Sequence, residues 1–266
     1  MMSLARRGTI LIGEQVLWLA GELQGLRTLF WRTNLALLRR RFTLRDVVEH
    51  TYQFSNKSVL FLMVTMGFVG MIMVFQACFQ AQRLLGDMSL IGPAFLQLVF
   101  REFAPTIGGL MVATRVGAGI AAEIGSMNVT EQIDALRMNG ADPVDHLVAP
   151  RIVAGLLAMF GLGVFSVVFM FIAGGVTAHT AFEVPYKNFF NIGLIRPLDV
   201  VSFLNKCLVY GYLIPLVAAR AGFIARGGSE GVGSATTRAV IECSLWILIF
   251  DLGIGAFYFV LQRAIA

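Results

Sequence analysis

The sequence predicts an all-α membrane protein with an amino-terminal interfacial helix, five transmembrane helices and a short cytoplasmic helix between spans two and three. The chain of 266 residues is 57% hydrophobic and only 14% charged, whereas soluble domains carry about 25% charged residues. Two stretches, Ile152–Phe182 with 31 residues and Ser58–Gln82 with 25, contain no Asp, Glu, Lys or Arg. Because about 20 apolar residues cross a bilayer, each stretch is long enough to span one.

For residues 1–56 the sequence predicts a cytoplasmic and interfacial amphipathic segment rather than a transmembrane span. Apolar residues recur at helical spacing over residues 9–38, but four charged residues interrupt them. We therefore expect a helix that lies in the membrane interface, with Trp18 and Trp31 near the lipid headgroups.

Residues 57–266 predict one five-span domain, with spans at about 58–82, 90–122, 152–178, 201–219 and 240–262. The second span repeats small residues at every fourth position, which places them on one helix face and favours close packing against neighbouring helices. These residues are Gly109, Ala113, Gly117, Ala121 and Gly125.

The net charge of +5 lies entirely in residues 1–58, which hold nine Lys and Arg against four Asp and Glu. With the amino terminus inside, fourteen basic residues lie on the cytoplasmic side of five spans and four lie outside. This asymmetry predicts a cytoplasmic amino terminus. We expect no nucleic-acid binding, because the basic charge adjoins a membrane span.

The sequence between spans two and three predicts a short amphipathic helix. Asn128 and Glu131 match a capping box at its start, and Gly140 suits its end. Asp142 and Pro143 then fit the N-cap and first position of the next helix. Within this short helix Val129, Ile133 and Leu136 share an apolar face.

Ionisable residues inside spans are costly and are usually paired or functional. Arg101 and Asp251 lie at similar depths from the outer ends of their spans, so we predict that they pair. We expect Glu102 to face Lys206 or a lipid headgroup. The alternative is that these charges only lock the helix bundle together.

No nucleotide-binding loop, metal-ligand cluster or disulfide framework is visible in the sequence. We therefore predict that the chain is not an enzyme and holds no cofactor. If it takes part in active transport, the ATP chemistry must lie in a partner chain.

Three motifs carry a resemblance to a known family: REFAP at 101–105, TRVGAGIAAEIGSMNVTEQIDALRMNGADPVDHLVAPR at 114–151, and GVGSATTRAV at 231–240. They resemble the MlaE/YrbE permease family, the membrane subunits of ABC transporters that move lipids with MCE-domain proteins. The likeness extends from about Arg39 to Asp251. The family's usual Leu and Gly are Phe103 and Ala104 here, and Met138-Asn139 stands where apolar residues are common.

The resemblance implies a homodimeric permease in the bacterial inner membrane, with an amino-terminal elbow helix. It implies a cytoplasmic ABC ATPase that binds ATP and Mg, a periplasmic MCE-domain protein and, in some members, a STAS-domain subunit. It also implies a coupling helix at about 129–138. The implied ATPase-coupling residues are Glu123, Val129, Glu131, Gln132, Ile133, Asp134, Leu136 and Arg137, and the implied lipid-path residues are Arg101, Glu102, Lys206, Arg238 and Asp251.

Two other functions are compatible with parts of the sequence. A secondary transporter or channel could use the buried charges as an ion or proton relay, although only Glu102 and Asp251 are acids deep in the spans. A membrane scaffold could use the 123–151 region for docking, but it would not need buried charges.

Overall fold

The computed structural model describes residues 21, 24–39, 42–84, 90–191 and 193–265. Within these ranges all regular secondary structure is helical, and five helical stretches are long and apolar enough to cross a membrane. The predicted fold class is confirmed. The helices are α2 (Leu44–Leu84), α3 (Ile91–Leu98), η1 (Val99–Phe103), α4 (Ala104–Val112), η2 (Ala113–Gly117), α5 (Ala118–Val129), α6 (Gln132–Met138), η3 (Val144–Val148), α7 (Ala149–Phe182), α8 (Tyr186–Phe189), α9 (Pro197–Ile224) and α10 (Gly228–Ile265).

The helices that contain the spans are longer than the apolar stretches in the sequence. Helix α2 begins at Leu44, so the boundary expected at residue 56 falls inside it. A helix satisfies its own backbone hydrogen bonds, and it therefore continues through polar flanking residues where the apolar pattern stops.

The second span runs from α3 to α5 and contains two π-helical turns, η1 and η2. Arg101 and Glu102 lie in η1, and Arg115 lies in η2. A π-turn widens the helix locally, and such turns are common at functional sites. Three of the four charged residues of this span therefore lie in its irregular turns, and the fourth, Glu123, lies in α5.

Glycines set the closest helix contacts in the bundle. A Cβ on Gly70 of α2 would lie against the Met170 carbonyl of α7. Farther along α7, a Cβ on Gly155 would lie 2.5 Å from the Gly211 carbonyl oxygen, and one on Gly211 would lie 2.8 Å from the Gly155 carbonyl oxygen. Helices α7 and α9 therefore meet backbone to backbone at these two glycines.

The small-residue face of the second span packs as predicted. Each of its five members, Gly109, Ala113, Gly117, Ala121 and Gly125, is buried. Gly109 faces Tyr210 of α9, and Gly117 faces Ile214 of α9 and Cys243 of α10. The stripe therefore forms a packing surface for α9 and α10.

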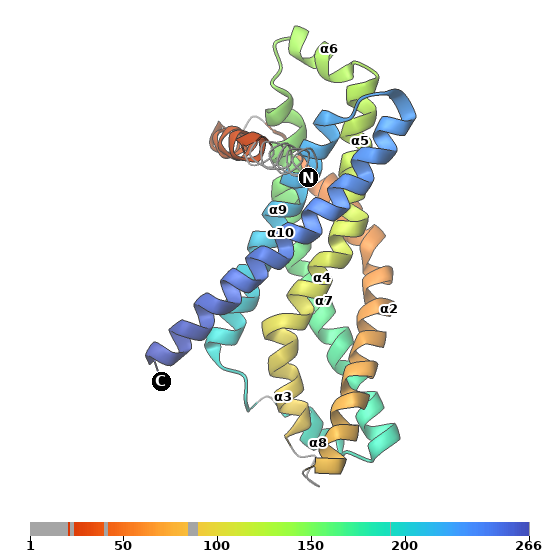
Figure 1. Cartoon of the computed structure of the whole chain (residues 1–266), viewed down its shortest axis with the longest axis vertical. Coiled ribbons are helices and arrows are strands. Elements are labelled where there is room, and N and C mark those ends of the chain that lie inside the picture. The colour runs from red at the N-terminus through yellow and green to blue at the C-terminus, as the bar shows by residue number, and fades with distance from the viewer. Residues whose placement is uncertain (1–20, 22–23, 40–41, 85–89, 192, 266) are drawn as a thin grey trace, which may run out of the picture.

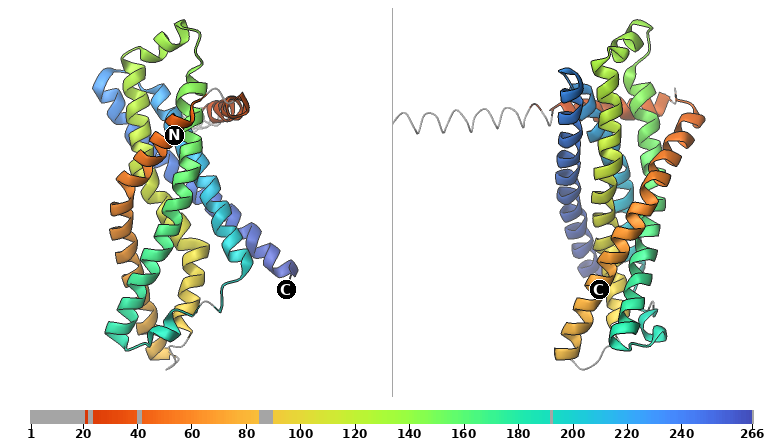
Figure 2. Two further views of the ribbon diagram at one scale, coloured as in Figure 1. Left: turned by 180° about the vertical axis from the view of Figure 1, so that it is seen from behind. Right: turned by 90° about the vertical axis from the view of Figure 1, so that its right-hand side faces the viewer.

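The amino-terminal helix, residues 24–39, lies across the bundle near the end that carries α6, whereas α8 lies at the other end (Figures 1 and 2). An Arg32–Asp142 ion pair of 3.0 Å ties it to the start of the third span. Trp31 is exposed, and Trp18 lies outside the described residues. The crosswise orientation agrees with the predicted interfacial helix.

Candidate functional site

Lys206 of α9 is the centre of a charge cluster inside the bundle. Its side chain is fully buried, and its Nζ donates to Glu102 Oε2 at 2.6 Å and to the Arg101 carbonyl oxygen at 2.7 Å. The same Nζ lies 2.7 Å from Asp251 Oδ1 on α10. The predicted contact between Glu102 and Lys206 is confirmed. One buried cation thus joins the second, fourth and fifth spans.

Asp251 is held by two hydroxyl groups as well as by Lys206. Thr106 Oγ1 and Tyr210 Oη each donate to Asp251 Oδ1 at 2.7 Å. A partly buried carboxylate is stabilised when such donors surround it. Thr106 and Tyr210 could not be identified from the sequence as partners of Asp251, because a hydroxyl-bearing residue in a transmembrane helix is common.

The predicted pair between Arg101 and Asp251 is wrong. Arg101 Nε instead lies 3.7 Å from Asp199 Oδ1, whose side chain has no exposed surface. The Asp199 carboxylate also accepts hydrogen bonds from the side-chain amides of Gln97 and Gln262. Depth along a helix says nothing about the direction in which a side chain points, and Asp199 lies on the side to which Arg101 points.

Arg238 does not join this cluster. It lies 13 residues before Asp251 on α10, about 20 Å along the axis, and its Nε is 2.7 Å from Glu242 Oε1. The cluster therefore contains four of the five predicted charges, together with Asp199. Glu102 and Arg101 are its most accessible members, with side chains 40% and 26% exposed.

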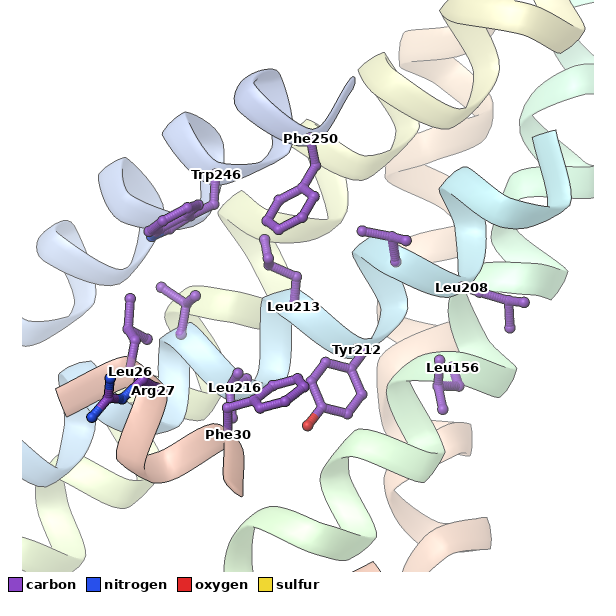
Figure 3. A pocket seen from close by; sticks show the side chains of 12 residues that line it. Leu26, Arg27, Phe30, Leu156, Leu208, Tyr212, Leu213, Leu216, Trp246 and Phe250 are labelled. Carbon is purple, nitrogen blue, oxygen red and sulfur yellow. The ribbon is translucent and has the colours of Figure 1, made fainter. Parts of the chain in front are cut away.

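An apolar pocket of ≈ 570 Å³ opens beside the cluster, between the amino-terminal helix, α7, α9 and α10 (Figure 3). Phe30 and Tyr212 pack ring to ring on one side of it, at a centroid distance of 5.6 Å. Its wall includes Val209 and Phe250, the neighbours in sequence of Tyr210 and Asp251. Apolar walls next to a few convergent polar groups are typical of small-molecule sites.

Helix α6 projects from the end of the bundle (Figure 1). Ile133 is fully buried and Leu136 partly buried, as the apolar face predicted, whereas Val129, the third member of that predicted face, is the last residue of α5. The polar coupling candidates of this segment are exposed, namely Glu131, Gln132, Asp134 and Arg137. Asp134 and Arg137 form a solvent-facing ion pair at 2.8 Å.

The start of α6 differs from the predicted capping box. Helix α5 continues to Val129, and the Asn128 amide donates to the carbonyl oxygens of Phe223 and Ala225 at the end of α9. Glu131 has φ 60° and makes no side-chain cap. A long-range tertiary partner has therefore replaced the local cap. Glu123 lies on α5, away from α6, and pairs with the buried Arg151 at 2.6 Å.

The end of α6 follows the prediction. Gly140 has φ 75°, and the Gly140 and Ala141 amides donate to the Arg137 and Leu136 carbonyls, as in a glycine-ended helix. Asp142 then accepts a hydrogen bond from the Val144 amide at the start of η3. Burial raises the pKa of Asp142, but the Val144 amide and the Arg32 guanidinium outweigh that effect, and the net pKa is lowered.

Comparison with known proteins gives one consistent result. The family model described as Permease MlaE matches residues 47–257. The chain is 34% identical to Protein TRIGALACTOSYLDIACYLGLYCEROL 1, chloroplastic, of Arabidopsis thaliana over 85% of its own length and 65% of that protein's length. It is 35% identical to a probable ABC transporter permease protein of Synechocystis, over 81% of this chain and 82% of the relative. A probable ABC transporter permease protein of Rickettsia felis is 32% identical, over 84% of this chain and 87% of the relative.

Proposed function

The chain belongs to the MlaE family of ABC transporter permeases, and we propose that it moves phospholipid or a related lipid between the inner membrane and a periplasmic MCE-domain protein. A separate cytoplasmic ATPase, which binds ATP and Mg, drives the transport. Two copies of the chain form the membrane core, with the amino terminus in the cytoplasm. The name of the Arabidopsis relative is that of a glycolipid, which supports a lipid as the substrate.

The main support for the proposal is the way in which α6 is anchored to the bundle while its polar side remains exposed. A seven-residue helix is too short to be stable alone, yet Ile133 and Leu136 anchor it and leave its polar face free. An exposed, firmly seated helix between two spans is suited to transmit movement from a soluble subunit. The fourteen-to-four excess of Lys and Arg supports its cytoplasmic location.

The pocket and the charge cluster together support a lipid substrate. Acyl chains need apolar walls, which the pocket beside α9 and α10 supplies. A headgroup needs polar partners, and Glu102 and Arg101 are the cluster members with the most accessible surface. Both features lie along the same pair of helices, so one lipid could contact both.

The ion-relay alternative is less well supported. In the part of the chain that the structure describes, Glu102 and Asp251 both contact Lys206. A relay needs a carboxylate that is free to hand a proton onward, whereas both of these carboxylates are held in contact with one buried cation.

The proposal is tested by purifying the tagged chain from native membranes in a mild detergent and identifying the bound proteins. We expect an ATPase and an MCE-domain protein, and in some hosts a STAS-domain subunit. Glu131→Lys reverses a charge on the exposed surface beside α6 and should remove the ATPase while the MCE-domain protein remains.

Glu183→Lys is the matched control. Glu131 and Glu183 are the two non-glycine residues with positive φ in the described part of the chain, both are exposed, and Glu183 ends α7 beside α8 at the opposite end of the bundle. Equal loss of the ATPase in both variants, or its retention in Glu131→Lys, would refute the assignment of α6. Recovery of the chain without an ATPase would refute the transporter proposal.

A further inference from the structure

A second pocket lies on the side of the bundle where α2 meets the second span. It has a volume of ≈ 120 Å³ and is polar at several points of its wall. The wall consists of Gln53, Phe54, Lys57, Ser58, Arg115, Val116, Gly119, Ile120 and Glu123. It shares no residue with the Lys206 cluster or with the apolar pocket beside α9.

The pocket carries an excess of positive charge. Lys57 and Arg115 are both exposed on its wall, and neither forms an ion pair with any residue that the structure describes. Glu123 is the one carboxylate on the wall, and it is already paired with Arg151, whose side chain is 3% exposed. Two cations therefore face this space without a carboxylate to balance them.

Ser58 gives an independent indication of a ligand. The residue is 1% exposed, and its hydroxyl group has no hydrogen-bond partner among the described residues. Buried hydroxyl groups are nearly always paired, and this one lies on the wall of the pocket between Lys57 and the second span. A ligand with acceptor oxygens would satisfy it.

The depth of the pocket identifies the source of such a ligand. Lys57 directly precedes the charge-free stretch Ser58–Gln82, and Arg115 lies seven residues before the expected inner end of the second span at residue 122, so the pocket lies near the α6-side boundary of the membrane. Lys and Arg residues near this boundary lie at the level where the anionic groups of membrane lipids attract them. The abundant anion within a membrane is the phosphate of a phospholipid, which Lys and Arg bind well.

We propose that this pocket binds the phosphate of one membrane phospholipid drawn in from the leaflet on the α6 side, through Lys57, Arg115 and Ser58. The volume is several times the roughly 10–15 Å³ that a cavity needs to hold one water molecule, so the space admits a group the size of a phosphate. Gly119 leaves the space open, since no atom would lie within 4 Å of a Cβ there. The site goes beyond the proposed transport function and does not depend on it.

The test is native mass spectrometry of the full-length chain in detergent, with a defined phosphatidylglycerol added over a range of concentrations. One spectrum gives both the number of bound lipids and the number of protein copies. Parallel samples receive inorganic phosphate alone, or a diacylglycerol with the same acyl chains and no phosphate.

We expect the Lys57→Gln/Arg115→Gln double variant to bind phosphatidylglycerol about tenfold or more weakly than the parent chain. The charge-preserving variants Lys57→Arg and Arg115→Lys should retain binding. Gly119→Phe fills the space without removing a charge, and it should also abolish binding. Arg83→Gln removes a basic residue from the far end of α2, where Arg83 stacks on Phe79, and should have no effect.

Equal phosphatidylglycerol binding by the parent chain and the double variant would overturn the proposal. Binding of diacylglycerol as strong as that of phosphatidylglycerol would also overturn the proposal, because the site would then recognise acyl chains and not the phosphate. Saturation by inorganic phosphate with no lipid bound would show a soluble anion as the ligand. Loss of a dimer in the double variant, with lipid binding unchanged, would mean that the two cations face a second copy.

Discussion

The strongest quantitative prediction concerns the three-way contact of Lys206, Glu102 and Asp251. Lys206→Met removes the cation from a fully buried position and leaves both carboxylates without it. Breaking a buried ion pair costs about 3–5 kcal/mol. We expect a value near the lower limit, because Glu102 is 40% exposed and water can partly replace the lost contact.

Double-mutant cycles divide this cost between the two pairs. Asp251 is 18% exposed and Glu102 is 40% exposed, so solvent screens the Lys206–Asp251 pair less. We expect a coupling energy of about 2 kcal/mol for Lys206→Met with Asp251→Asn, and about 1 kcal/mol for Lys206→Met with Glu102→Gln. Arg101→Gln with Asp251→Asn should couple by less than about 0.5 kcal/mol, because the two side chains make no contact.

The free energies of unfolding can be measured by titrating the purified chain in mild detergent with a denaturing detergent and following its tryptophan fluorescence. The reasoning is refuted if Arg101 couples to Asp251 more strongly than Lys206 does. It is also refuted if removing Lys206 leaves the free energy of unfolding unchanged.

Three further predictions follow from local geometry, and each can be measured by thermal unfolding. Gly70→Ala should destabilise the chain by about 1–3 kcal/mol, because the added methyl group meets the Met170 carbonyl. Glu131→Gly should raise the melting temperature slightly, since it relieves a left-handed conformation that costs a non-glycine residue about 1–2 kcal/mol. Arg32→Gln should cost at most about 1 kcal/mol at neutral pH, because the Arg32–Asp142 pair is partly exposed. As the folded-state pKa of Asp142 is lowered, this contribution is present above the ordinary value of 3.8 and is lost as the pH falls below it.

The five spans and the small-residue face were predictable because both depend on patterns local to one helix. A run such as Ile152–Phe182 must be buried in lipid whatever its neighbours are. Likewise Gly109 and Gly117 share a face on any helix. The end of α6 at Gly140 was predictable for the same reason, since a glycine with positive φ is a local property.

The partners of the buried charges were not predictable in the same way. The choice between Asp199 and Asp251 as the partner of Arg101 depends on how the helices are rotated about their axes, and the π-turn at Val99–Phe103 changes that rotation. Asn128 failed as a cap because α5 brings it beside the last carbonyls of α9. Both outcomes require the tertiary arrangement.

The backbone contact between Gly155 and Gly211 fixes the separation of α7 and α9 at one level of the bundle. Because the two backbones already touch, neither helix can move closer there, whereas a tilt about that point leaves the contact in place. Gly155 lies 11 residues from the start of η3 at the α6 end, whereas Lys206 lies five residues beyond Gly211 on the opposite side. If α7 tilted relative to α9 about this contact, the two helices would separate at one end and approach at the other. The α6 end lies about 16 Å from the contact and the level of Lys206 about 8 Å from it, on the opposite side. Spin labels placed in pairs on α7 and α9 at the two levels would then record one distance that lengthens while the other shortens.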